Sequence, residues 1–146
     1  MIVRLIALVL LAQAGAAPVQ PPKSPLFAAH RLSCSFGLYA AAIWKDTTPQ
    51  VVSRTQNLAF QIDSIDTKKN TARIVNGGAA ALVSMIVTPT GINLVEKTQI
   101  GNLNVTTIFA AGGQGNVFLA VHSRHIGDLT TAPSVSQNYG TCEIPQ

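Results

Sequence analysis

The chain has 146 residues, a formal net charge of +4 and only 11% charged residues. Its basic residues are scattered along the chain, whereas nucleic-acid-binding proteins cluster them with aromatic residues. The composition therefore argues against a nucleic-acid partner and is typical of a small globular domain.

Residues 1–16 have the layout of a secretory signal peptide. A single cation, Arg4, precedes an apolar run over residues 5–12, and Ala14 and Ala16 form an A-x-A cleavage site. The apolar run is too short to span a bilayer, which takes about 20 residues. We expect cleavage after Ala16 and a secreted or periplasmic mature protein with nine basic and six acidic residues.

Residues 17–30 contain four prolines, which fix φ and prevent regular hydrogen bonding. This composition predicts a disordered, proline-rich tether. The remaining residues, 31–146, are expected to form a single β domain.

Short runs of alternating apolar and polar residues follow, separated by turn signals, as is typical of an all-β protein. The expected strands cover residues 33–43, 58–63, 71–75, 79–87, 92–97, 103–109, 117–121 and 139–144, with a short extra strand at 51–54. Leu103, Val105 and Phe109 share one strand face, and Val117, Leu119 and Val121 share another.

Turns are expected at residues 45–49, 66–70, 88–91, 99–102 and 112–116. The sharpest turn signal is Asn76-Gly77, because both residues tolerate the positive φ of a type I′ hairpin. Residues 126–138 are expected to form a long polar loop that covers one mouth of the domain.

Two cysteines, Cys34 and Cys142, fall in the first and the last expected strand. An even count favours a disulfide in an oxidising compartment, with free thiols or intermolecular pairing as the alternatives. Disulfide-linked Cα atoms lie within about 7 Å of each other, so the bridge would hold the two end strands together.

An antiparallel up-and-down meander of about eight strands leaves two open edges, and closure into a small β-barrel removes them. We therefore expect an all-β closed barrel, with a β-sandwich as the alternative. A membrane barrel needs aromatic girdles, and aromatic residues make up only 5% of the chain. No stable membrane insertion is expected.

The segment AVHSRH, residues 120–125, is the most suggestive for binding. In a strand His122 and Arg124 point to one face, and Ser123 and His125 to the other. The two histidines therefore do not converge on one metal, so no metal site is expected. His122, Arg124 and His125 are the expected contacts to a ligand or partner.

No residue set predicts catalysis or a cofactor. Ser123, His125 and Asp128 are the residue types of a hydrolase triad, but they crowd within six positions and lack a nucleophile elbow. Five carboxylates could act as acid and base, but nothing in the sequence singles out a pair: Asp63, Asp66, Glu96, Asp128 and Glu143.

The stretches TARIVNGG (71–78), FLAVHSRH (118–125) and SQNYGTC (136–142) resemble small secreted bacterial β-proteins of uncharacterised function. This resemblance covers about the region from Cys34 to Cys142 and implies neither an activity nor functional residues. In architecture alone, the expected barrel is similar to lipocalin-like barrels and to small periplasmic barrels that inhibit lysozyme.

These features predict an exported, non-enzymatic and monomeric β-barrel that binds an unknown small ligand or a surface. The alternative is an inhibitor of an extracytoplasmic hydrolase such as lysozyme, which would act on that protein through an inserted loop.

Overall fold

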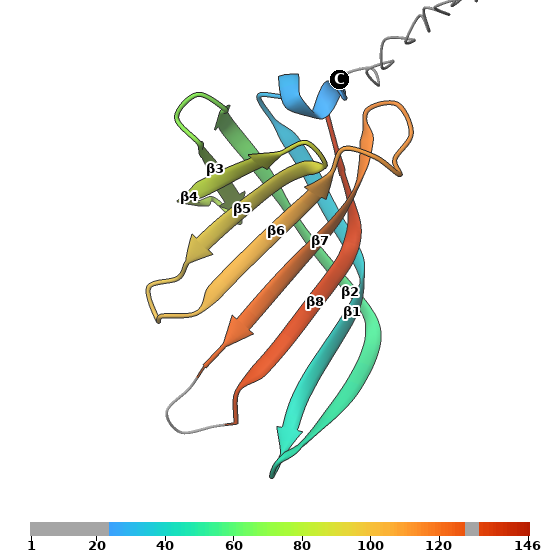
Figure 1. Ribbon diagram of the computed structural model, residues 1–146, viewed down its shortest axis with the longest axis vertical. Helices are drawn as coiled ribbons and strands as arrows, with labels where there is room; N and C mark the ends of the chain where they lie inside the picture. The colour runs from blue at the N-terminus through green and yellow to red at the C-terminus, as the bar shows by residue number, and fades with distance from the viewer. Residues whose placement is uncertain (1–23, 128–131) are drawn as a thin grey trace, which may run out of the picture.

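The computed structural model describes residues 24–127 and 132–146. The expected signal peptide, the tether up to residue 23 and Asp128 lie outside the described residues. In chain order, the elements are η1(Pro25–Ala28), β1(Leu32–Lys45), β2(Thr48–Asp66), β3(Thr71–Asn76), β4(Ala79–Thr88), β5(Gly91–Lys97), β6(Leu103–Phe109), β7(Val117–Ile126) and β8(Ser134–Glu143) (Figure 1). No helix in this part of the chain has the length and hydropathy needed to cross a membrane.

The eight strands form one antiparallel sheet in which each strand pairs with the next along the chain. β8 pairs in turn with β1, from Ser33↔Glu143 to Ile43↔Ser134, and so closes the hydrogen-bonded ring. The prediction of an all-β up-and-down meander that closes on itself is confirmed, and the described strands form one sheet rather than the two of a sandwich.

A disulfide joins the two strands where the sheet closes. Cys34 and Cys142 are direct cross-strand partners, and their Cα atoms lie 4.0 Å apart. Close approach of β1 and β8 also needs Gly140, because a Cβ at that position would lie 2.0 Å from the backbone oxygen of Ser35. The predicted disulfide between Cys34 and Cys142 is confirmed.

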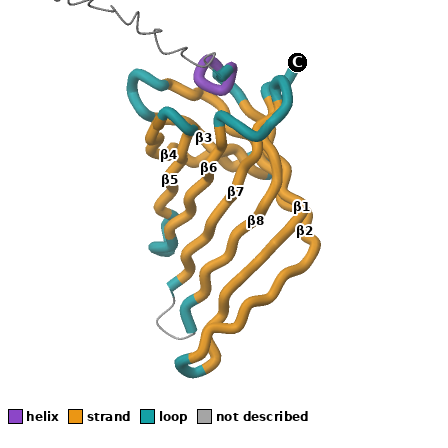
Figure 2. Tube along the Cα trace, turned by 45° about the vertical axis from the view of Figure 1, so that its right-hand side comes forward, coloured by secondary structure: helices purple, strands orange, loops and turns teal. Residues whose placement is uncertain are grey.

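The short helix η1 covers one end of the barrel (Figure 2). Its Leu26 is completely buried in the core, and the Ser24 hydroxyl accepts a hydrogen bond from the Leu26 N–H. The amide of Ile65 donates to the carbonyl of His30, which ties the following residues to β2. The prediction of a disordered tether is therefore wrong for residues 24–30, because Leu26 gains a buried apolar site.

β2 is one continuous strand, so the predicted loop at residues 45–49 and separate strand at 51–54 are corrected. β1 and β2 pair from Lys45↔Thr48 onward, and only two residues, Asp46 and Thr47, connect them. Pro49 is tolerated inside β2 because the outer edge of the strand has no partner strand there among the described residues.

The predicted hairpin between β3 and β4 is present, but its turn lies one residue further along. Gly77 and Gly78 have positive φ values of 56° and 86°, whereas Asn76 still belongs to β3. Two successive residues with positive φ match the type I′ turn that suits the twist of a two-residue hairpin.

The predicted loop at residues 126–138 is too long, because β8 already begins at Ser134. The inward residues of this strand segment, Ser136 and Asn138, are polar and buried. The segment therefore lacks the apolar alternation by which strands are recognised in a sequence.

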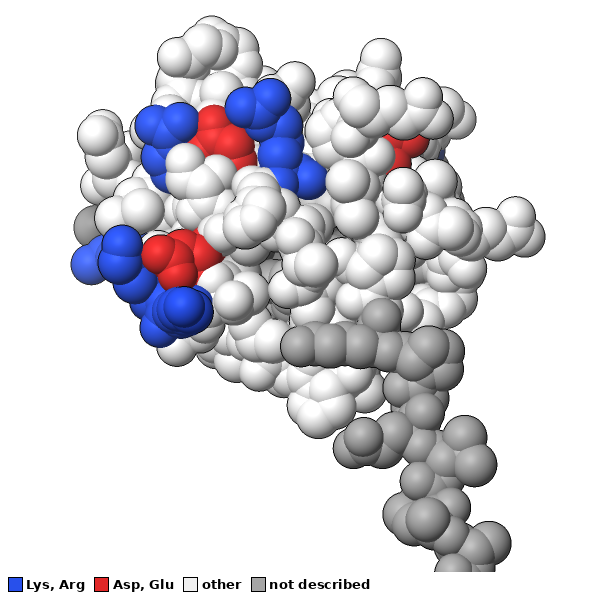
Figure 3. Space-filling model, turned by 90° about the horizontal axis from the view of Figure 1, so that it is seen from above, with Lys and Arg blue, Asp and Glu red and all other residues white. Residues whose placement is uncertain are grey.

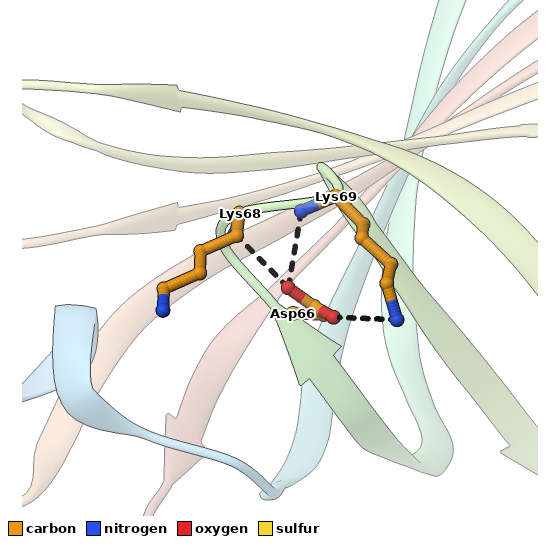
Figure 4. Close-up of polar contacts among 3 residues, drawn as sticks. All are labelled: Asp66, Lys68 and Lys69. Carbon is orange, nitrogen blue, oxygen red and sulfur yellow. Dashed lines mark hydrogen bonds and ion pairs between the residues drawn. The ribbon is translucent and has the colours of Figure 1, made fainter.

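The turn between β2 and β3 is held by Asp66, as predicted for residues 66–70 (Figure 4). Asp66 Oδ1 accepts hydrogen bonds from the amides of Lys68 and Lys69, each at 3.0 Å. Lys69 Nζ lies 3.4 Å from Asp66 Oδ2. These contacts, with the Lys69 amide foremost, lower the pKa of the Asp66 carboxyl.

The ring of strands is complete only in the half of the barrel near η1. β3 pairs with β2 only over Gln61↔Val75 to Asp66↔Thr71, and β5 pairs with β4 only up to Val95. Beyond these points β1, β2, β7 and β8 continue away from η1, and the β1–β2 hairpin reaches furthest (Figure 1). The barrel therefore opens on the side of the β3–β4 hairpin.

Candidate functional site

The interior of the barrel changes from apolar to polar with distance from η1. The half near η1 is filled by buried apolar side chains, among them Leu26, Leu32, Phe36, Ile62 and Ile108. In the open half, buried polar side chains come from β6, β7, β8 and the residue before β6: Asn102, Asn104, Thr106, His122, Ser136 and Asn138.

Cross-strand register arranges these polar side chains in two rows around the inner wall. The row nearer the core runs through Thr106, His122 and Asn138, which are neighbours on β6, β7 and β8. The next row runs through Glu96, Asn104 and Arg124 on β5, β6 and β7.

His122 sits at the boundary between the apolar core and the polar half and is only 7% exposed. Its Nδ1 lies 2.9 Å from the Thr106 hydroxyl, and its ring packs edge-on to Phe60 with centroids 5.3 Å apart. Burial, foremost, and the charge of Arg124 together lower the pKa of His122 to about 4, and the charge of Glu96 opposes the shift. The imidazole is therefore neutral near pH 7.

Two buried amide groups each leave an oxygen without a donor. Asn104 Nδ2 donates to Glu96 Oε2 at 2.7 Å, and Asn138 Nδ2 donates to the His122 carbonyl at 3.3 Å. Because each amide nitrogen faces an acceptor, the orientation of both amides is fixed. The Oδ1 atoms of both asparagines are buried and lack a hydrogen-bond partner within the described chain.

A cavity of about 350 Å³ lies where the barrel opens, beside the β3–β4 hairpin. One wall is mainly apolar and comes from β2, β3 and β4; it contains Leu58, Phe60, Ile74, Asn76, Ala79, Ala80 and Ala81. The facing wall is polar and comes from β5, β6 and β7; it contains Glu96, Asn104, His122 and Arg124. Cavities with this mixture of walls are typical of small-molecule sites.

Arg124 is the exposed cation of this cavity. Residues 24–127 and 132–146 contain two ion pairs, Lys69–Asp66 and Arg73–Asp63, and neither involves Arg124. Within these residues its guanidinium pairs with no carboxylate, and it can bind an anionic group in a planar, two-pronged geometry.

The structure places two of the three expected contact residues in one cavity. His122 and Arg124 both point inward and line it, as their shared strand face predicts. His125 lies on the outer face of β7 between its partners Leu103 and Val135, and it is exposed. Ser123 also faces outward and so lies apart from His122.

From the sequence, Glu96 was named only as one of five carboxylates, and Asn104, Thr106 and Asn138 were not singled out as contact residues. Apolar and polar residues do alternate with a period of two along β6, as in a half-buried strand. In the structure, however, mainly apolar residues of β6 face outward and polar residues face inward. Leu103 and Phe109 are exposed, whereas Asn104 and Thr106 are buried. No group of three or more metal-ligating side chains converges within the described residues.

A larger hollow, about 740 Å³, lies at the end covered by η1. Arg73 donates to both oxygens of Asp63 at 2.8 and 2.9 Å there, which lowers the pKa of the Asp63 carboxyl. Seen from this end, basic and acidic side chains lie next to one another rather than in a patch of one sign (Figure 3). Asp63 and Arg73 of this hollow thus already pair with each other.

No protein-family model matches the sequence, and the comparisons with curated proteins and with solved structures find no match either.

Proposed function

We propose that the protein is an exported, non-enzymatic binding protein that takes a small ligand into the cavity beside the β3–β4 hairpin. The observation that carries the proposal is the pairing of an apolar wall with a polar wall in one cavity of about 350 Å³. The Cys34–Cys142 disulfide is compatible with an oxidising compartment and so supports export.

The cavity is also built on regular strands rather than on loops. Its polar groups project from β5, β6 and β7, whose backbones pair along their length. Side chains on rigid elements are held close to one geometry, which reduces the entropy lost on binding. This arrangement favours ligand binding over a purely structural role for the buried polar rows.

The test uses native mass spectrometry of the protein exported from its producing cells, followed by release and identification of any bound small molecule. We expect a bound species that is lost from the variant Ala81→Phe, because Ala81 lines the cavity and a phenyl ring would fill it. The matched control is Leu82→Phe, since Leu82 points outward and is 75% exposed.

Retention of the bound species by Ala81→Phe would place the ligand elsewhere. The binding proposal is wrong if the exported protein carries no small molecule and no metabolite raises its melting temperature in a thermal-shift screen.

A second candidate function is inhibition of an extracytoplasmic hydrolase, and the projecting β1–β2 hairpin favours it. Trp44 and Val51 lie near its end on the same face and are 42% and 78% exposed. A hairpin with exposed apolar residues can fill an active-site cleft. Purified protein should then slow lysozyme in a cell-wall lysis assay, and Trp44→Ala should restore the rate; an unchanged lysis rate with the intact protein excludes inhibition of lysozyme.

A further inference from the structure

We infer that the cavity binds a zwitterionic molecule with an apolar body, of the class of free α-amino acids with apolar side chains. This inference rests on the proposed function of the cavity and names the ligand class. Three features of the cavity lead to it: one anionic group, one cationic group, and an apolar wall opposite both.

The two charged groups stand on one row of the inner wall. Glu96 pairs with Asn104 across β5 and β6, and Asn104 pairs with Arg124 across β6 and β7. Neighbouring strands lie about 4.8 Å apart, so the backbones that carry Glu96 and Arg124 are separated by roughly 10 Å. Both side chains line the same cavity, but they form no ion pair in the described structure.

The acceptor side of this row suits an ammonium group. One oxygen of Glu96 accepts from Asn104 Nδ2, and Asn104 Oδ1 is a buried acceptor without a donor. An ammonium group has three donors and no acceptor, so it binds best where acceptors gather. At the other end of the row, the guanidinium of Arg124, which lines the cavity, matches a carboxylate.

The charges of the cavity balance, which distinguishes a zwitterion from a simple anion. Glu96 and Arg124 contribute one charge of each sign, and His122 is neutral near pH 7. Arg54, the cation of β2, lies over the Tyr39 ring at 4.8 Å from its centroid and is not among the residues that line the cavity.

The apolar wall and the volume of the cavity indicate the polarity and the size of the ligand's side chain. Leu58, Phe60 and Ile74 face the charged row, and the alanines of β4 leave room in front of them. A volume of about 350 Å³ is at the small end of the range for ligand sites, which is roughly 300–1,000 Å³. A single amino acid such as leucine fits this size better than a longer peptide does.

The experiment is isothermal titration of the exported protein with L-leucine and three analogues. N-acetyl-L-leucine lacks the ammonium group, L-leucinamide lacks the carboxylate, and L-leucyl-L-leucine separates the two charges. We expect L-leucine to bind and each analogue to bind about tenfold or more weakly, because the two blocked analogues each leave a charged group of the cavity unpaired and the dipeptide holds its two charges at a different spacing.

Two variants link each charge of the ligand to its residue. Arg124→Gln should weaken L-leucine about tenfold or more and leave L-leucinamide unchanged, whereas Glu96→Gln should weaken L-leucine and leave N-acetyl-L-leucine unchanged. The controls are Lys97→Gln and His125→Asn, because these neighbours on the same strands point outward. They should bind L-leucine like the parent protein.

The outcomes separate this inference from the proposed function. Tighter binding of the dipeptide than of L-leucine, or a ligand from the exported protein that lacks either charge, overturns the amino-acid assignment and leaves the cavity a ligand site. Equal L-leucine binding by the parent and both charge variants also overturns it. Absence of any ligand that Ala81→Phe displaces overturns both.

Discussion

At the scale of single residues, His122 couples the stability of the fold to pH. An unfolded histidine has a pKa near 6.5, whereas burial lowers the pKa of His122 to about 4. Between these two values the unfolded chain binds the proton more strongly than the folded chain does. The contribution of His122 to the free energy of unfolding is therefore fully present above about pH 6.5. It is lost as the pH drops toward 4, which lowers the free energy of unfolding by about 3 kcal/mol.

The measurement is urea unfolding at several pH values between 4 and 7, compared with the variant His122→Gln. The variant should lose the part of the pH slope that His122 causes, whatever its absolute stability. His125→Asn should keep the slope, because His125 is exposed on the outer face. Equal slopes for the parent protein and His122→Gln would contradict this account of the buried imidazole.

At the scale of elements, the pairing of β1 with β8 depends on a glycine. A Cβ at Gly140 would lie 2.0 Å from Ser35 O and 2.6 Å from Phe36 Cα, and backbone atoms cannot rotate aside. Gly140→Ala should thus force the two strands apart and lower the free energy of unfolding by about 3 kcal/mol. The control Gly37→Ala should change it by less than about 1 kcal/mol, because nothing lies within 4 Å there.

Chemical denaturation of both glycine variants provides the measurement. Equal stability of Gly140→Ala and the parent protein would show that β1 and β8 do not approach as closely as described.

The helix η1 is the second element that can be tested alone. Leu26 is the side chain by which η1 enters the core, and it is completely buried. Leu26→Ala should lower the free energy of unfolding by about 2–4 kcal/mol. Leu103→Ala, at an exposed outer position, should cost much less in the same thermal or urea unfolding experiment. Similar losses for both variants would mean that η1 does not stabilise the barrel.

At the scale of the whole molecule, the disulfide closes a loop over nearly the entire barrel. The sequence separation of its cysteines is 108 residues, for which the chain-entropy model gives about 4.7 kcal/mol as an upper figure. Replacing Cys34 and Cys142 together by Ala should lower the melting temperature by about 10 °C or more. The check is thermal unfolding of the double variant and of the parent protein with and without reductant, and unchanged melting in both cases contradicts the expectation.

The number of strands and their order could be predicted from the sequence, because the signals that set them are local. Residues 58–63 alternate with the period of a strand, and turn signals such as those at residues 66–70 end the strands. With two cysteines, only one intramolecular pairing was available. Because Cys34 and Cys142 lie in the first and last strands, this pairing also predicted that β1 and β8 lie side by side.

Only the tertiary structure decided which face of each strand is inside. In β6 the alternation has the same period whether Leu103 or Asn104 faces the interior, and hydrophobicity alone favours the face of Leu103 and Phe109 as the inner one, whereas both are exposed. Pairing with β5 and β7, and closure of the ring, turned Asn104 and Thr106 inward. The cavity follows from that register, because it brings Glu96 and Arg124, which are distant in the sequence, onto one row.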